Sequence, residues 1–266
     1  MTTASLALPG PRLVRADLLK LRRRRSLVAT VSLMTGGAMV IANVVLLSLH
    51  AANPAKHGPA GGIVNLGHTS FLLTVLSGVA AALVGASAGV GDLDAGVYRD
   101  LVVTGRSRMA LYLSRIPAGL LFLLPFVAVA YTLTAVASVA FSGSLAAPGA
   151  ALLAETGVWI LANASFYYLL ALGLAAAIAS RSQTIGIVLA WRLAVTPILL
   201  SISAFGIGRE LVPAAALERF APSALAGDLR QGPHVGVSLA VAVAVLAVWA
   251  LALVGGGAWR DTRRDA

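Results

Sequence analysis

The side chains best suited to chemistry are the charged residues of segment 91–115, which separates two long apolar stretches. Its carboxylates Asp92, Asp94 and Asp100 lie close together, and such a cluster could bind Mg²⁺ in a lipid head-group transferase. Membrane phosphatidyltransferases, however, use an Asp-Gly pair followed by further spaced aspartates. Here an alanine follows Asp94, and after Asp100 the next acidic residue is Glu155. The segment therefore lacks the ligands for that enzyme class.

Other catalytic residue types give no alternative site. The sequence has no cysteine, which excludes disulfides, thiol catalysis and thiolate metal sites. Its histidines lie in or beside expected outer loops, without the i, i+4 spacing of a helical zinc site: His50, His57, His68 and His234. No GxxxxGK[ST] motif is present, so the chain has no phosphate-binding loop for ATP hydrolysis.

The elements around the charged segment are predicted to be membrane helices. Hydrophobic residues make up 59% of the 266 residues and charged residues only 11%, unlike an ordinary soluble domain. A helix needs roughly 20 mostly apolar residues to cross the bilayer, and continuous apolar stretches favour helices over a barrel. The sequence predicts an all-α integral membrane protein with six spans: about 27–49, 69–90, 116–141, 156–179, 184–205 and 235–257. The length of the first stretch favours a retained helix over a secretory signal.

The arginines and lysines predict the orientation of these spans. With six spans, both tails share a side with the loops after the second and fourth spans, and that side carries most of the basic residues. The opposite side keeps four: Lys56, Arg209, Arg219 and Arg230. Five or seven spans would put the two basic tails on opposite sides. The net charge of +10 is thus explained by topology, without nucleic acid as a partner.

Three regions follow from this pattern. Residues 1–26 are a cytoplasmic amphipathic segment in which Val14, Leu18 and Leu21 share one helical stripe, which suits a helix in the membrane interface. The alternative is a disordered basic anchor. Residues 27–257 form the six-helix transmembrane domain, and residues 258–266 form a cytoplasmic tail.

The charged segment itself is predicted to contain a short helix from Ala95 to Val103. Asp94 is the expected N-cap and Gly105 the expected C-cap, while Ser107 is expected to cap the third span. Asp92, Asp94, Arg99 and Asp100 would then be exposed as a polar knob facing the cytoplasm. The simpler interpretation is a solvated turn whose charges cap helices.

Small residues line one face of the second span and predict close approach of another helix: Gly78, Ala82, Gly85 and Gly89. Arg192 is the one charge well inside a span, and its nearest polar candidates are Asn163 and Tyr167 on the fourth span. Pro197 would kink the fifth span just beyond Arg192. A functional role for Arg192 and snorkelling toward the inner surface remain equally open.

The loop at 206–234 contains LVPAAALERFAP, a stretch with helical character and proline near both ends. Leu211, Leu217 and Phe220 could dip into the interface as part of a short re-entrant or outer helix. A plain surface loop is the alternative.

The chain resembles the permease subunits of type-2 ATP-binding cassette exporters. Between their second and third spans these permeases carry an acid, Gly-Thr, leucines, Thr-Pro and basic residues. The corresponding positions here are Asp94, Gly96, Leu101, Thr104, Arg106 or Arg108, and Arg115; the pattern departs at Val97 and Gly105. The layout of basic amphipathic start, six spans, charged inner loop and long outer loop is also similar.

The resemblance implies that two permeases form the substrate pathway and two separate cytoplasmic ATPases, which bind the ATP and Mg²⁺, drive it. This chain would bind no cofactor, and segment 91–115 would be the coupling loop. The implied coupling residues are Asp92, Asp94, Gly96, Arg99, Asp100, Thr104, Arg106 and Arg108. The second and fifth spans would line the dimer interface and pathway. Whether the dimer contains two identical chains stays open.

The sequence fits two other classes of membrane protein less well. A secondary transporter should carry intramembrane acids for ion coupling, and none lies clearly within a span. A multi-pass membrane enzyme acting on lipids would need a catalytic constellation that the sequence does not contain. The expected location is the cytoplasmic membrane of a bacterium, with both termini in the cytoplasm.

Overall fold

The computed structural model describes residues 10–97, 103 and 107–263, and within them every regular element is a helix. Six helical stretches are long and apolar enough to cross a membrane: Arg25–Ala52, Gly62–Asp94, Arg108–Ala140, Ala150–Ile178, Arg181–Ser201 and Leu239–Arg263. This confirms the predicted all-helical fold with six candidate spans, which fits a multi-pass membrane protein.

Each span is one helix or a short series of helices. The first comprises α2 (Arg25–Ser32), the π-helical turn η1 (Leu33–Gly37) and α3 (Ala38–Ala52). The fifth comprises α8 (Arg181–Ala190), the π-helical turn η2 (Trp191–Val195) and α9 (Thr196–Ser201). The others are single helices: α4 (Gly62–Asp94), α6 (Arg108–Ala140), α7 (Ala150–Ile178) and α11 (Leu239–Arg263).

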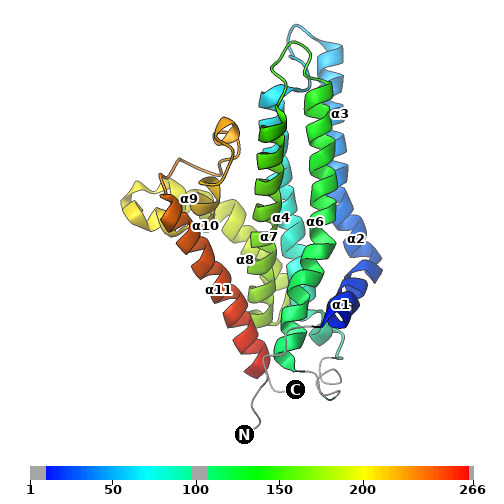
Figure 1. The fold of residues 1–266 in the computed structure, drawn as a ribbon, viewed down its shortest axis with the longest axis vertical. Helices are drawn as coiled ribbons and strands as arrows, with labels where there is room; N and C mark the ends of the chain where they lie inside the picture. Colours follow the sequence, from blue (N-terminus) through cyan, green and yellow to red (C-terminus); the bar gives the residue numbers. More distant parts are fainter. Residues whose placement is uncertain (1–9, 98–102, 104–106, 264–266) are drawn as a thin grey trace.

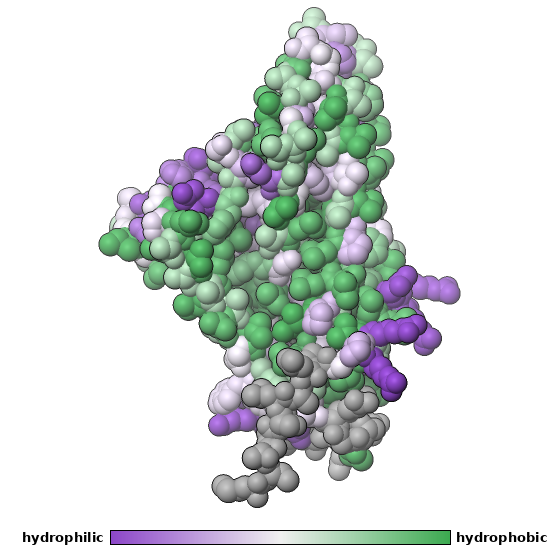
Figure 2. Space-filling view, viewed as in Figure 1, coloured by the Kyte–Doolittle hydropathy of each residue, from purple (hydrophilic) through white to green (hydrophobic). Residues whose placement is uncertain are grey.

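The helices α3, α4, α6 and α7 stand side by side as a tall bundle, while α11 slopes away from it toward α9 and α10 (Figure 1). The surface of the bundle is largely hydrophobic, and hydrophilic residues gather near α1 (Pro11–Arg23) and on the side of α9 and α10 (Figure 2). An apolar outer surface with polar groups kept at a few places is what a bilayer requires.

Helix α4 packs most extensively against α7, and small residues permit the close approach. A Cβ atom added at Gly85 would lie 2.7 Å from Cβ of Ala171, and one at Gly89 would lie 2.5 Å from Cβ of Ala175. Ala82, in the same stripe, is fully buried. Gly85 and Gly89 therefore form a packing face, and its partner is α7 of the same chain.

Helix α4 ends in a motif that the sequence prediction misassigned. Gly96 has a φ of 68°, its N–H donates to the Leu93 carbonyl, and the Val97 N–H donates to the Asp92 carbonyl. These two bonds and the left-handed glycine form a Schellman cap. Asp94 is consequently the last residue of α4, and the prediction that it caps a new helix at Ala95 was wrong.

The start of α6 agrees with its prediction, because Ser107 Oγ accepts a hydrogen bond from the Ala110 N–H at 3.1 Å. Residues 98–102 and 104–106 lie outside the described part of the chain, so the rest of the expected 95–103 helix is not described.

The 206–234 segment lies along the flank of the tall bundle, below the upper ends of α6 and α7 (Figure 1). It contains the end of η3 (Ser203–Leu211), α10 (Pro213–Glu218) and η4 (Ser223–Leu225). The Trp159 indole donates to the Leu217 carbonyl at 2.8 Å, which fixes α10 against α7. The predicted helical stretch is present; Leu217 is buried, whereas Leu211 and Phe220 are exposed.

Candidate functional site

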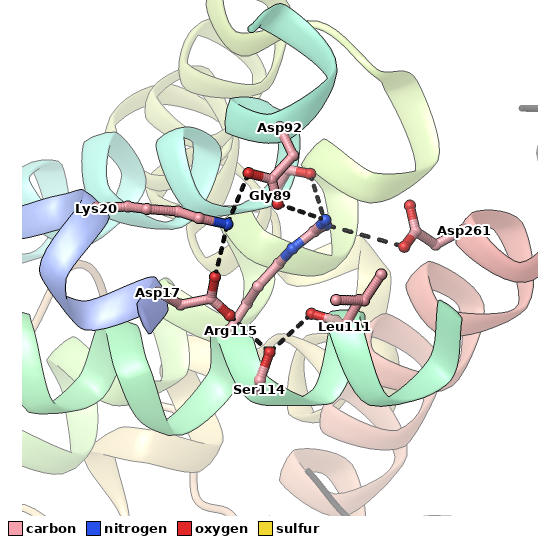
Figure 3. Close-up of polar contacts among 8 residues, drawn as sticks. All are labelled: Asp17, Lys20, Gly89, Asp92, Leu111, Ser114, Arg115 and Asp261. Atoms are coloured by element: carbon pink, nitrogen blue, oxygen red, sulfur yellow. Dashed lines mark hydrogen bonds and ion pairs between the residues drawn. The ribbon is translucent and has the colours of Figure 1, made fainter. Parts of the chain in front are cut away.

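An ion cluster joins α1 to the ends of three spans (Figure 3). Two charged residues of α1, Asp17 and Lys20, point toward α4 and α6. The Lys20 ammonium lies 3.0 Å from an Asp17 oxygen and 2.9 Å from an Asp92 oxygen. The second Asp17 oxygen accepts from Ser114 Oγ at 2.6 Å.

Arg115 is the centre of this cluster and only 3% of its side chain is exposed. Its Nη2 lies 3.3 Å from an Asp92 oxygen, and its Nη1 donates to the Gly89 carbonyl at 3.0 Å. The Asp261 carboxylate, on α11, lies 3.9 Å from Nη1. The backbone carbonyl of Arg115 accepts from Tyr168 Oη at 2.6 Å. One arginine of α6 therefore contacts α4, α7 and α11.

The surroundings of Lys20 in the cluster favour its charged form. Burial lowers the pKa of Lys20, but the hydrogen bonds to Asp92 and Asp17 and the negative charge of both outweigh it. The pKa of Lys20 is consequently raised above its ordinary value of 10.5, so the ammonium persists at neutral pH.

The cluster changes the interpretation of the predicted coupling residues. Asp92 was expected to be exposed, and it is buried because two cations of other helices enclose it. Asp94 and Gly96 are exposed. Arg108 donates to the Thr262 carbonyl at 3.3 Å and so links α6 to the end of α11. The remaining predicted coupling residues lie outside the described residues: Arg99, Asp100, Thr104 and Arg106.

A second polar site surrounds Arg192, which is only 1% exposed. Its Nη1 donates to Asn163 Oδ1 at 3.3 Å, and its guanidinium carbon lies 3.9 Å from the centre of the Tyr167 ring. Its Nη2 donates to the Thr74 carbonyl at 2.7 Å. The predicted contacts with Asn163 and Tyr167 are confirmed. Arg192 points into the helix bundle, which excludes snorkelling in this conformation.

Gly78 leaves room for this guanidinium, because an added Cβ would lie 2.6 Å from Arg192 Cζ. Of the predicted stripe, Gly78 therefore faces η2, while Gly85 and Gly89 face α7. Pro197 lies near the start of α9, directly after the π-helical turn. A proline cannot donate to the carbonyl four residues earlier, and its ring clashes with that group, so the irregular turn has a local cause.

The histidines form no common site. His50 Nδ1 lies 2.8 Å from the His57 carbonyl oxygen, and His234 Nδ1 lies 2.8 Å from Glu218, which also pairs with Arg230. His68 is exposed within α4. In the described residues, no group of three or more His, Cys, Asp or Glu side chains could hold a metal ion.

Sequence reasoning did not assign Asp17, Lys20, Arg115 and Asp261 to one cluster. A signal was present in residues 1–26, where Asp17 is the one acid among basic residues. A lone acid on a basic amphipathic helix suggests a specific cationic partner. Its partners could not be named, because Ser114 is 97 residues away in the chain.

Comparisons with known protein families and with curated proteins identify no relative of this chain: no protein-family model matches it, and no curated protein matches it.

Proposed function

We propose that this chain is the membrane-spanning permease subunit of an ATP-binding cassette exporter. Two such chains would form the substrate pathway, and a separate cytoplasmic ATPase would dock on the 91–115 segment. The protein would reside in a bacterial cytoplasmic membrane with both termini in the cytoplasm. The ATP and Mg²⁺ would be bound by the partner ATPase.

The observation that carries this proposal is the position of the ion cluster at the root of the charged segment. Asp92 lies in the last turn of α4, and Arg115 lies two turns into α6. These two residues pair with each other, and Lys20 and Asp261 bring in α1 and α11. A force applied to the segment would therefore reach four helices through short ionic contacts.

The position of Asp94 also suits docking. It is exposed at the end of α4, where a carboxylate interacts unfavourably with the negative end of the helix dipole. An exposed acid that does not stabilise its own helix is available to a basic partner surface. Asp92 would act differently, as a buried residue that holds the root of the segment.

Co-purification with an ATPase encoded beside this chain tests the proposal. Asp94→Ala and Arg99→Ala should reduce ATPase binding and coupled ATP hydrolysis in reconstituted membranes, while the permease still inserts and folds. Arg219→Ala, which removes an exposed charge of the 206–234 segment, is the matched control and should leave both unchanged. Full binding and full coupled hydrolysis in both loop variants would refute the docking assignment.

A further inference from the structure

Arg192 is a buried cation with no acidic partner among the described residues. Fully burying a charge inside a membrane span is costly, and such a residue ordinarily pairs with an opposite charge or faces water. No ion pair in the described part of the chain includes Arg192. The contrast with Arg115 is clear, because that arginine lies near two carboxylates.

The groups that do contact Arg192 are neutral. They are the Asn163 amide oxygen, the Thr74 carbonyl and the Tyr167 ring. The Thr74 carbonyl also accepts from Ser77 Oγ at 3.1 Å, so it is shared between donors. Arg192 Nε is buried and has no hydrogen-bond partner. The guanidinium thus retains unused donor capacity in a dry environment.

Two further buried hydroxyl groups lie one helical turn from residues of this site. Thr196 Oγ1, one turn further along the fifth span, and Ser70 Oγ, one turn from Thr74 on α4, are both buried without a hydrogen-bond partner. Each hydroxyl could donate to an anion. These unsatisfied hydroxyls, each one helical turn from a residue of the Arg192 site, match the chemistry of an acidic group.

The exposed face of the fifth span near Arg192 is apolar, with Leu193 and Ile198 both more than half accessible. A ligand approaching from this side would cross the bilayer region of the protein, so it must carry an apolar tail with its acid. Charge-assisted hydrogen bonds, above all bidentate ones from arginine, are about twice as strong as neutral ones. An acid could therefore displace the Asn163 amide.

We propose that Arg192 receives the acidic head group of an amphiphilic ligand between α4, α7 and the π-helical turn η2. We further infer that this ligand is the transported substrate, and this part of the inference rests on the proposed transport function. Binding itself does not, and it can be measured without ATP or an ATPase. Failure of docking and failure of ligand binding are therefore separate results.

Binding is tested with the purified chain in phosphatidylcholine nanodiscs, titrated with decyl phosphate. Trp191 adjoins Arg192, and its ring lies 5.6 Å from that of Trp249, so tryptophan fluorescence reports on this region. A saturable change is expected with decyl phosphate, and not with decanol or inorganic phosphate at the same concentrations. An equal response to decanol would show that binding does not depend on the charge, and an equal response to inorganic phosphate would show that it does not depend on the apolar tail. Either result would overturn the proposal.

Three variants test whether decyl phosphate binds at Arg192. Arg192→Gln should weaken decyl phosphate binding by about tenfold or more, because it removes the charge-assisted bonds. Arg219→Gln, at an exposed position, should bind like the parent protein. Asn163→Ala should bind severalfold more tightly, because it removes the neutral competitor for the guanidinium. A purely structural Arg192 would give no such tightening.

The Asn163 variant also decides the outcome if Arg192→Gln does not fold. Unchanged or weaker binding in Asn163→Ala would then overturn the proposal. In a folded Arg192→Gln protein, unchanged binding would do the same.

Discussion

Asp92→Asn is expected to destabilise the protein far more than Lys20→Met, although both changes break the same ion pair. Asp92 also pairs with Arg115, whose side chain is 3% exposed, whereas the Lys20 side chain is 45% exposed. Removing one partner of a buried pair typically costs about 3 to 5 kcal/mol, because the other charge is left uncompensated. An exposed pair contributes about 0.2 to 1 kcal/mol.

The lower end of the first range applies to Asp92. Arg115 would keep its bond to the Gly89 carbonyl and its longer contact with Asp261 after the substitution. We therefore expect a loss of about 3 kcal/mol for Asp92→Asn, which raises the unfolding constant by about a hundredfold. Lys20→Met keeps the aliphatic stem of the side chain and should lose about 1 kcal/mol or less.

The assay is reversible unfolding by sodium dodecyl sulfate in mixed micelles, followed by circular dichroism. Asp94→Asn, two residues away and exposed, is the matched control and should change the free energy of unfolding by less than about 0.5 kcal/mol. The reasoning fails if Asp92→Asn is no more destabilising than Lys20→Met, because Arg115 would then not depend on Asp92 for its charge balance.

Three further outcomes are expected. Gly89→Val should destabilise by about 1 to 3 kcal/mol in the same assay, since its side chain would collide with Ala175 of α7; wild-type stability would contradict the close packing. Trp159→Phe should cost about 1 kcal/mol and speed proteolysis of the 206–234 segment, because the bond to the Leu217 carbonyl is lost; unchanged proteolysis would count against this bond. The raised pKa of Lys20 means that its stabilising contribution is complete below about pH 10.5 and is lost as the pH rises through the folded-state pKa. Alkaline titration of stability should therefore show a decline that is smaller in Lys20→Met, and identical curves would contradict it.

The spans were predictable because hydropathy alone identifies apolar stretches of sufficient length. Their ends were not, because a helix continues until a backbone signal stops it. Helix α4 begins at Gly62 rather than near 69 and ends at the Schellman cap of Gly96. Helix α6 begins at Arg108 rather than near 116, next to the cap at Ser107. A hydropathy window does not detect these extra helical turns, because they contain polar residues.

The two arginine sites differ in how far the sequence could locate them. Only Ala179 and Ser180 separate α7 from α8, so residues on facing sides of these antiparallel helices could be paired by counting from the turn. For this reason the sequence could predict that Asn163 is a neighbour of Arg192. The ion cluster unites residues from four helices that are distant in the sequence, and the assignment of Asp94 as the N-cap of a new helix had placed Asp92 on an exposed loop.

Helix α7 connects the two sites through consecutive residues. The Tyr167 ring lies against the Arg192 guanidinium, and the Tyr168 hydroxyl donates to the Arg115 carbonyl. Both tyrosines are almost completely buried, and the small residues of α4 hold α7 at close range. A rotation or shift of α7 large enough to break one contact must therefore disturb the other. Under the proposed function, movement at the root of the 91–115 segment would change the packing around Arg192 by this direct physical connection.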